Sequence, residues 1–378
     1  MYQTTIYSGL EGLAMLSDEW AVLLACVSQP RFFHYYGWWR SYVTSLVANP
    51  ADFLLVVVRE AARAVAIVPL ERRRRRILGS TVRMFALPQH DHLPLGDIVC
   101  RADVSADALV TSINRALEAH GGWDVLEFLR VLDGSSVARL LSGGPMCVTT
   151  VPYPCYYLDC ARPYETIVSG FSRNFRSNLN KARNKLKREA DVDFQAVTEA
   201  GALRGAFGEF LRIESSGWKG RAGQGTAIEL HPTLVKFYET LMDELGPQGN
   251  IVINLLRVGK RAIAAQFCTK DADTLYVLKL AYDEEWARLA PGNMLLEWVI
   301  QGAGAGAGFR YLNMVNDPPW FADWCPQSVP ICNVRRYNST AKGVALVTAS
   351  RAKRWVKPVY VECRERLARW RAGASAAR

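Results

Sequence analysis

The sequence predicts an α/β (α+β) protein of two domains, each with a mixed, largely antiparallel sheet flanked by helices. Three observations support this fold class. The chain has 378 residues, which is more than one ordinary domain needs and enough for two domains to bury separate cores. Runs rich in β-branched residues follow one another across short turns in both halves, as in antiparallel meanders. Segments in which apolar residues have helical spacing separate these runs.

The first half, residues 1–160, is expected to form one domain. Short apolar runs follow one another there, and small or polar residues separate them. A helix is expected to start at Ser105, which can cap it, and to end at the pair Gly121-Gly122. A further strand follows this helix, and we place the domain boundary near residue 160. The expected strands are 53–60, 64–73, 82–88 and 123–131.

The second half, residues 161–345, opens with an amphipathic helix within 171–189. Apolar residues recur there at every third or fourth position, and the opposite face is basic. Two more helices, a three-strand meander, an apolar helix that starts at Pro291 and a last strand are expected to follow. Residues 346–378 are expected to form a basic helical tail. The expected strands are 250–258, 261–270, 274–282 and 309–315.

Composition restricts the classes of function. Half of the residues are hydrophobic, so disorder is not the expected state. The net charge of +10 indicates an anionic partner, which leaves nucleic acid, a nucleotide cofactor, an acidic glycan and a membrane surface open. No apolar run approaches the roughly 18 residues that span a bilayer, and the start lacks a signal-peptide pattern. We therefore expect a cytoplasmic protein without a membrane span.

Metal binding is not expected. The nine cysteines are scattered without a CxxC pair, so we interpret them as reduced, mostly buried thiols. His90 and His92 are only two positions apart and lack a third ligand in the sequence around them.

The turn before the apolar helix carries small residues where a capping side chain would be usual. Pro291 fixes φ, and Gly292 lets a ligand approach the backbone closely. The amides of Asn293, Met294 and Leu295 would then face outward, and unpaired amides at a helix start form an anion site. A pyrophosphate fits such a site, although a simple loop-helix junction explains the same residues.

Several segments together resemble the CelD-like branch of the GNAT acyltransferase superfamily, which is related to the FemABX peptidyltransferases. The resemblance covers nearly all of residues 50–345 and implies tandem GNAT-like domains. It also implies transfer of an acyl group from acyl-coenzyme A (acetyl-coenzyme A or a longer acyl-coenzyme A) to an amine of a small molecule or glycan. The segments are PLERR (69–73), RSNLNKARNKLKRE (176–189), ESSGWKGRAGQGTAI (214–228), LKLAYDEEWARLAPGNMLL (278–296) and YLNMVNDPPWFADW (311–324).

The resemblance implies roles for residues in these segments. Arg288 and Gly292 match the remnants of the glycine-rich cofactor signature of GNAT proteins. Glu214 leads the Glu-x-x-Gly-Trp-Lys-Gly stretch, and a less polar environment beside Trp218 would suit a general base. Asp283, which flanks the cofactor loop, is the second candidate for the base. Lys219 is expected to hold an anionic group of the substrate or a cofactor phosphate.

Further residues are expected in the acceptor pocket. Lys279 alternates along its strand with residues that place it on the same face as apolar neighbours, which implies a buried partner or a ligand. Asp91 has a counterpart in a similar loop of the family, which implies a role in the substrate pocket. The residues after the last strand complete this pocket: Asn316, Asp317, Trp320 and Trp324.

Two alternatives stay open. One is a FemABX-like transferase that uses aminoacyl-tRNA, which would explain the basic helix face and the run Arg72–Arg76. Since no aromatic residues interleave with these basic side chains, a solvated surface is the more usual explanation. The other alternative is a GNAT fold that binds without catalysis. The oligomeric state is open.

Overall fold

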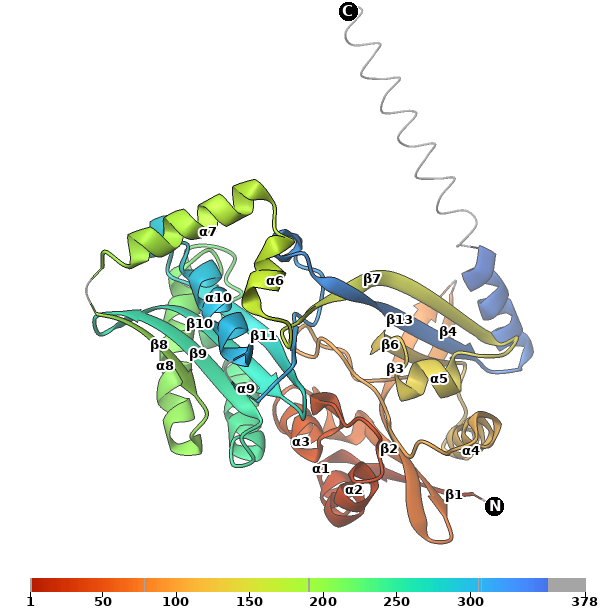
Figure 1. Ribbon diagram of the computed structural model, residues 1–378. Coiled ribbons are helices and arrows are strands. Elements are labelled where there is room, and N and C mark those ends of the chain that lie inside the picture. Colours follow the sequence, from red (N-terminus) through yellow and green to blue (C-terminus); the bar gives the residue numbers. More distant parts are fainter. Residues whose placement is uncertain (1, 78, 190, 305, 307, 353–378) are drawn as a thin grey trace, which may run out of the picture.

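The computed structural model describes residues 2–77, 79–189, 191–304, 306 and 308–352. One mixed sheet of thirteen strands runs through the molecule (Figure 1). Its strand order is β1-β2-β3-β4-β6-β13-β7-β12-β11-β10-β9-β8, and β5 pairs with β3 beside this path. The strands are β1 (Gln3–Ser8), β2 (Phe53–Glu60), β3 (Arg63–Ile77), β4 (Ser80–Ala86), β5 (Val99–Cys100), β6 (Val125–Leu132), β7 (Cys147–Asp159), β8 (Val192–Val197), β9 (Ile251–Val258), β10 (Arg261–Lys270), β11 (Thr274–Tyr282), β12 (Tyr311–Asn313) and β13 (Gln327–Tyr337).

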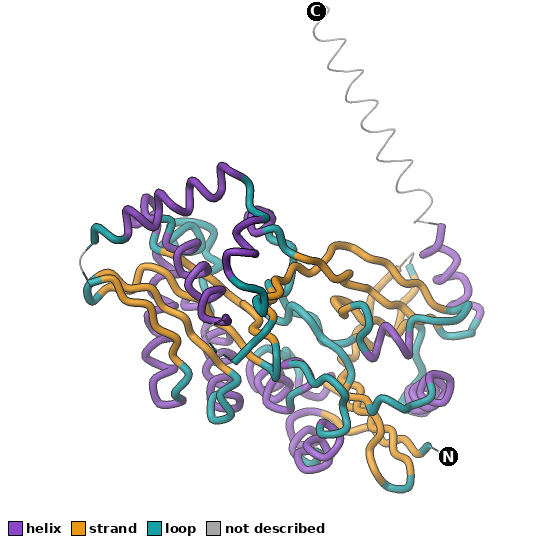
Figure 2. Tube along the Cα trace, in the orientation of Figure 1, coloured by secondary structure: helices purple, strands orange, loops and turns teal. Residues whose placement is uncertain are grey.

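Helices cover both faces of the sheet (Figure 2). The α-helices are α1 (Gly9–Ala14), α2 (Ser17–Leu24), α3 (Tyr36–Ser45), α4 (Ala106–Ala119), α5 (Ser136–Leu141), α6 (Tyr164–Ser169), α7 (Arg173–Leu186), α8 (Ala200–Ser216), α9 (Pro232–Leu245) and α10 (Pro291–Gly304). The 3-10 helices are η1 (Phe32–His34), η2 (Pro50–Asp52), η3 (Ile228–Leu230), η4 (Glu284–Leu289) and η5 (Pro319–Trp324).

The fold class expected from the sequence is confirmed. The strands pair antiparallel except at β4–β6 and β11–β12, which are parallel. Both meanders form, β2-β3-β4 in the first half and β9-β10-β11 in the second. Helix α4 follows Ser105, and α7 starts at the expected place because the Ser172 hydroxyl accepts a hydrogen bond from the Phe175 amide at 3.1 Å.

The long strands β7 and β13 connect the two halves of the sheet. β13 pairs with β6 on one side and with β7 on the other, and β7 also pairs with β12. β13 belongs to the later part of the chain but lies between two strands of the first half. The division into residues 1–160 and 161–345 stays a prediction. In any such division, β13 would belong to the second domain by sequence but to the sheet of the first domain by pairing. Of the expected tail 346–378, residues 353–378 lie outside the described residues.

The second half is a three-layer arrangement. Along β10, alternate side chains enter two different apolar clusters: Phe267 packs with α8 and α9, whereas Ala264 and Cys268 pack with α7 and α10. This alternation is what strand geometry requires of a sheet buried on both faces. Helices α8 and α10 therefore lie on opposite faces of β9-β10-β11, and a ligand at the end of these strands can be approached from either face.

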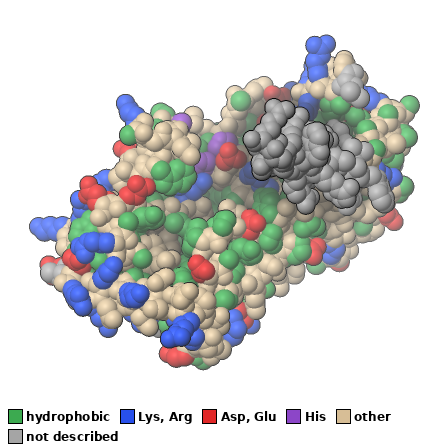
Figure 3. Space-filling view, turned by 90° about the horizontal axis from the view of Figure 1, so that it is seen from above, with side chains coloured by type: hydrophobic (Ala, Val, Ile, Leu, Met, Phe, Trp, Pro, Cys, Tyr) green, Lys and Arg blue, Asp and Glu red, His purple; other side chains and the backbone are tan. Residues whose placement is uncertain are grey.

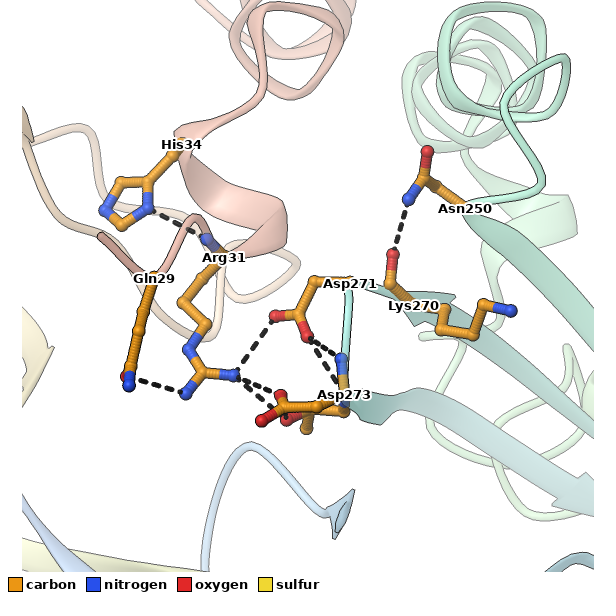
Figure 4. Close-up of polar contacts among 8 residues, drawn as sticks. Gln29, Arg31, His34, Asn250, Lys270, Asp271 and Asp273 are labelled. Carbon is orange, nitrogen blue, oxygen red and sulfur yellow. Dashed lines mark hydrogen bonds and ion pairs between the residues drawn. The ribbon is translucent and has the colours of Figure 1, made fainter. Parts of the chain in front are cut away.

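An arginine from the first half fixes the turn between β10 and β11. Arg31, beside η1, donates from Nη1 to Asp273 at 2.9 Å and to the Thr274 hydroxyl at 3.0 Å, and it lies 3.5 Å from Asp271 (Figure 4). The Asp271 side chain is 1% exposed, and a buried carboxylate needs such a partner. This contact attaches the β10-β11 turn to the first half and so positions β11.

Candidate active site

Strand β11 loses its neighbour on one side before it ends. It pairs with β12 at three positions, from Thr274 opposite Tyr311 to Tyr276 opposite Asn313. The chain then turns away at Val315, which has a left-handed φ of 56°. Within the described chain, residues 277–282 have no strand partner on this side. Because the backbone groups of a strand alternate in direction, every second N–H and C=O there is free to bind a ligand.

A cavity of ≈ 400 Å³ lies between the end of β11 and the start of α10, and we call it the α10-side cavity. Its wall is largely apolar. It is lined by Ala265, Gln266, Leu280, Ala281, Tyr282, Ala287, Ala290, Pro291, Gly292, Asn293, Leu295 and Trp320.

A second cavity of ≈ 490 Å³ lies toward α8, and we call it the α8-side cavity. It shares Leu280, Ala281, Tyr282 and Trp320 with the first cavity, so the two meet at the unpaired end of β11. Its other lining residues are Ile213, Glu214, Gly217, Trp218, Lys219, Glu284 and Asn316.

The start of α10 differs in detail from the expectation. Ala290 has a left-handed φ of 48°, and its carbonyl accepts a hydrogen bond from the Met294 amide at 3.1 Å. The prediction that the Met294 amide faces outward is therefore wrong, because the helical hydrogen bonds begin one residue earlier. The amides of Gly292 and Asn293 have no protein acceptor in the part of the chain that the structure describes. These two amides are the free donors at the helix start.

Some of the other residues expected at the cofactor site line the cavity, and others do not. Pro291, Gly292, Asn293 and Leu295 line the α10-side cavity. Met294 is 2% exposed and packs in the core. Arg288 does not line the cavity, because its guanidinium pairs with Glu189 at 2.7 Å and lies 5.8 Å from the Trp286 ring. The role predicted for Arg288 would require it to leave Glu189.

Gly292 has an ordinary backbone conformation. Its φ lies outside the left-handed region, and an added Cβ would have Tyr282 Cδ1, at 3.6 Å, as its nearest described neighbour. That distance is a normal van der Waals contact. The fold therefore does not require a glycine here, and the missing side chain leaves the cavity open beside the free amides.

Glu214 and Lys219 form the polar wall of the α8-side cavity. The Glu214 Oε1 atom accepts from Lys219 Nζ at 3.0 Å, and its Oε2 atom accepts from the Ile228 amide at 2.9 Å. Glu214 is in the last turn of α8 and is 4% exposed. Lys219 Nζ also lies 5.6 Å from the ring of Trp218, a tryptophan that is 58% exposed. The structure thus brings the three residues of the sequence motif together.

Asp283, the second candidate for the base, does not line either cavity. It is 2% exposed, and its Oδ2 atom accepts from Arg261 Nη2 at 2.7 Å. Its Oδ1 atom accepts from the Glu285 amide at 3.2 Å and so caps η4. These contacts describe a structural residue that holds the loop before α10, and its catalytic role stays a prediction.

A β-bulge on β11 changes the face on which Lys279 lies. Phe267 of β10 is opposite Lys279, but the next residue, Cys268, is opposite Val277, so Leu278 is the extra residue of the bulge. Lys279 therefore shares the α8-side face with Phe267, whereas Val277 packs on the α10 side. Lys279 has apolar neighbours on its face, but they do not include Val277, because strict alternation does not continue through a bulge.

Burial and the nearby charge of Lys219 lower the pKa of Lys279 to about 8, with Glu214 and Asp91 acting in the opposite direction. Lys279 has no carboxylate within 4 Å among the residues described. Asp91 is exposed and lies 3.4 Å from Arg130.

Sequence reasoning missed a partly buried pair near this lysine. His92 Nδ1 and the Tyr238 hydroxyl are 2.9 Å apart, and burial lowers the pKa of His92 to about 2. The charges of Lys279 and Lys219 add to this effect. His92 therefore stays neutral, and nothing local in the sequence distinguishes it from His90.

The residues after β12 are divided between the cavity wall and the core. Asn316 lines the α8-side cavity, and Trp320 lines both cavities. Asp317 lines neither. Trp324 is fully buried and packs edge-on against Phe171 and Phe175. The expectation that Trp324 lines the acceptor pocket is at odds with this position, because its ring belongs to the core beneath α7.

The described residues contain no helix long and apolar enough to cross a membrane. They also contain no group of three or more His, Cys, Asp or Glu side chains placed to hold a metal ion.

Comparison with known proteins identifies the class. The sequence profile of the acetyltransferase (GNAT) domain matches residues 173–320, the segment that supplies all lining residues of both cavities. Together with the observed architecture, this match defines a GNAT acyltransferase-type fold. The match covers less than half of the chain, and this segment is similar to GNAT acetyltransferase domains. A search of curated proteins found no match.

Three solved structures share the fold over most of this chain. FemX has a TM-score of 0.54 at 11% identity and is matched over 85% of this chain and 96% of its own. L-PGS from Bacillus licheniformis has a TM-score of 0.53 at 12% identity, over 88% and 95%. The C-terminal domain (DUF2156) of a putative lysylphosphatidylglycerol synthetase from Agrobacterium fabrum has a TM-score of 0.51 at 11% identity, over 89% and 96%. At these identities the likeness concerns the fold.

Proposed function

We propose that the protein transfers an acyl group from acyl-coenzyme A to an amine of a small molecule or glycan. The observation that carries this proposal is the meeting of two cavities at the unpaired end of β11. A thioester in the α10-side cavity and an amine in the α8-side cavity would reach each other there. Neither substrate would have to cross the sheet.

The α10-side cavity suits the donor. The free amides of Gly292 and Asn293 lie at a helix start, where a pyrophosphate is stabilised by hydrogen bonds and by the helix dipole. The arm of coenzyme A would lie along the unpaired edge of β11, which supports backbone hydrogen bonds in the manner of an added strand. One of the same N–H groups would polarise the thioester carbonyl.

The α8-side cavity suits the acceptor. Trp218 and Trp320 are 58% and 41% exposed, and their rings offer flat apolar surface to a small molecule or a sugar ring. Lys219 and Asn316 line the same cavity and would bind polar groups of the acceptor. Lys279, Asp91 and Asp317 lie outside the cavity wall, and we propose them as contacts for a larger acceptor.

The proposed reaction needs one base. The amine nitrogen attacks the thioester carbonyl carbon, so that a C–N bond forms and the C–S bond breaks. The proton lost by the amine goes to the carboxylate of Glu214, and the leaving thiolate takes a proton from solvent. Both Glu214 oxygens already accept one hydrogen bond, and each carboxylate oxygen has a second lone pair for a substrate amine.

Calorimetric titration of the purified protein with acetyl-coenzyme A, a long-chain acyl-coenzyme A and tRNA tests this proposal. We expect saturable binding of the coenzyme A thioesters that changes little with salt. A protein that binds none of the thioesters would contradict it.

One observation favours a second candidate, transfer from aminoacyl-tRNA, which the resemblance to FemABX proteins implies. The outer face of α7 is basic, and Figure 3 shows Lys and Arg side chains gathered at the end of the molecule that carries this helix (left). These side chains form no ion pair with a described carboxylate. They are Arg173, Arg176, Lys181, Lys185, Lys187 and Arg188.

The basic face of α7 reaches the loop before the α10-side cavity, because Lys185 Nζ donates to the Arg288 carbonyl at 3.3 Å. An RNA bound along α7 would thus end near the donor site. The salt dependence separates the candidates: tRNA affinity should fall steeply between 50 and 200 mM salt, by roughly 10³-fold or more if about six phosphates are contacted. A protein that binds neither tRNA nor thioester would be a GNAT fold without this catalytic function.

A further inference from the structure

A buried glutamine in the floor of the α10-side cavity has no role in the reaction described above. Gln266 of β10 lies between Asn254 of β9 and Leu280 of β11, its direct partners in the sheet. Gln266 and Asn254 are 3% and 2% exposed. The cluster of residues on this face of the sheet, beneath α10, is otherwise apolar. Two buried amides in such surroundings are costly unless they are hydrogen-bonded.

The hydrogen bonds of this pair fix the orientation of Gln266. Asn254 Nδ2 donates to Gln266 Oε1 at 3.2 Å, and it also lies 3.7 Å from Cys268 Sγ. Gln266 Oε1 is thereby directed toward β9. Its Nε2 group has no protein acceptor in the described part of the chain, and Gln266 is one of the residues that line the α10-side cavity.

The Nε2 atom is not among the fully buried described side-chain atoms that lack a partner, so it is open to the cavity, and a leucine or methionine would serve equally well if this wall only had to be apolar. The glutamine and its supporting asparagine are therefore explained by a ligand that supplies the missing acceptor. The cavity wall contains no Lys, Arg or His side chain among the described residues, so a carboxylate would be poorly stabilised there. The acceptor is a neutral oxygen.

We propose that Gln266 binds the acyl donor, with its Nε2 group donating a hydrogen bond to a neutral carbonyl or hydroxyl oxygen of the thioester substrate. This inference rests on the proposed function. The oxygen belongs either to an amide of the arm that carries the sulfur or to a substituent on the acyl group. Donors with a carboxylate on the acyl chain are disfavoured in both cases.

Calorimetric titrations of the parent protein and Gln266→Met test the inference with three probes, which are coenzyme A, acetyl-coenzyme A and 3-hydroxybutyryl-coenzyme A. Methionine keeps the length of the side chain and removes the donor. We expect about tenfold weaker binding, which equals about 1.4 kcal/mol. If the oxygen is on the arm, all three probes weaken equally. If it is on the acyl group, the hydroxyacyl probe alone weakens.

Leu256→Met is the matched control, because Leu256 is buried on the same face of the sheet but does not line the cavity. It should bind all probes as the parent does. The double variant Asn254→Leu/Gln266→Met removes both polar groups, so that Asn254 is not left without its partner. It replaces the single variant in the titrations if the single variant unfolds. Binding of all probes by a folded Gln266 variant with the parent's affinity would overturn the inference alone. A parent that binds no probe would overturn the proposed function as well.

Discussion

Glu214 and Lys219 form an ion pair at the wall of the α8-side cavity, with Oε1 and Nζ 3.0 Å apart. The Glu214 side chain is 2% exposed, whereas that of Lys219 is 25% exposed. Both side chains line the cavity, and the ammonium is the more accessible of the two. An acceptor amine that enters would bind the remaining lone pairs of this carboxylate, beside the ammonium of Lys219.

Glu214→Gln tests the role of this carboxylate as the base. The glutamine keeps one oxygen for the Ile228 amide and loses the oxygen that Lys219 contacts, so the end of α8 should stay folded while the ion pair is lost. We expect turnover to fall at least tenfold, since loss of a general base typically costs about 10² to 10⁴. Donor affinity, measured by calorimetry, should change little. Glu229→Gln, at an exposed position, is the control. Unchanged turnover in Glu214→Gln would show that the general base is Asp283 or water instead.

Asp283→Ala separates a structural from a catalytic role for the second carboxylate. Because this side chain caps η4 and pairs with Arg261, we expect a loss of about 0.5–2 kcal/mol in the free energy of unfolding. Turnover of the folded fraction should stay within about threefold of the parent. Glu285→Ala removes only the exposed partner of Arg261 and serves as the control. A large loss of turnover in fully folded Asp283→Ala would establish Asp283 in catalysis.

The lowered pKa of Lys279 predicts how stability depends on pH. Its pKa is about 8 in the folded protein, against an ordinary value of 10.5. Between these values the unfolded chain binds more protons than the folded one, so this lysine makes stability rise with pH from about 8 to 10. Urea unfolding at several pH values should show the rise in the parent and a flatter profile in Lys279→Met. An equal slope in both proteins would contradict the assignment, and exposed Lys260→Met is the control.

The elements that depend on local pattern could be predicted from the sequence. The meander over β9, β10 and β11 follows from short β-rich runs with polar turns, and the start of α7 follows from Ser172 and the apolar spacing behind it. The motif that contains Glu214, Trp218 and Lys219 supplies three lining residues of one cavity, and their roles stay a prediction. These signals need no knowledge of distant segments.

The features that depend on pairing between distant segments could not be predicted. The bulge opposite Phe267 is a property of two strands in register, and it placed Lys279 and Val277 on opposite faces. The position of β13 between β6 and β7 joins segments nearly 200 residues apart. Trp324 entered the core because it meets Phe171, which precedes α7, and Phe175 of α7 there. Gln266 did carry a signal, since it is the one amide in an apolar strand.

The most direct test of the account is acyl-coenzyme A binding by Gly292→Val. The backbone at Gly292 is ordinary and an added Cβ would meet only Tyr282 at 3.6 Å among its described neighbours, so the variant should fold and melt like the parent. Its side chain would fill the space beside the amides of Gly292 and Asn293. Gly205→Val, at an exposed helical glycine with no described neighbour within 4 Å, is the control. Calorimetric titration should show at least tenfold weaker binding, a loss of about 1.4 kcal/mol, in Gly292→Val alone, and an affinity equal to that of the parent would contradict a phosphate site at the start of α10.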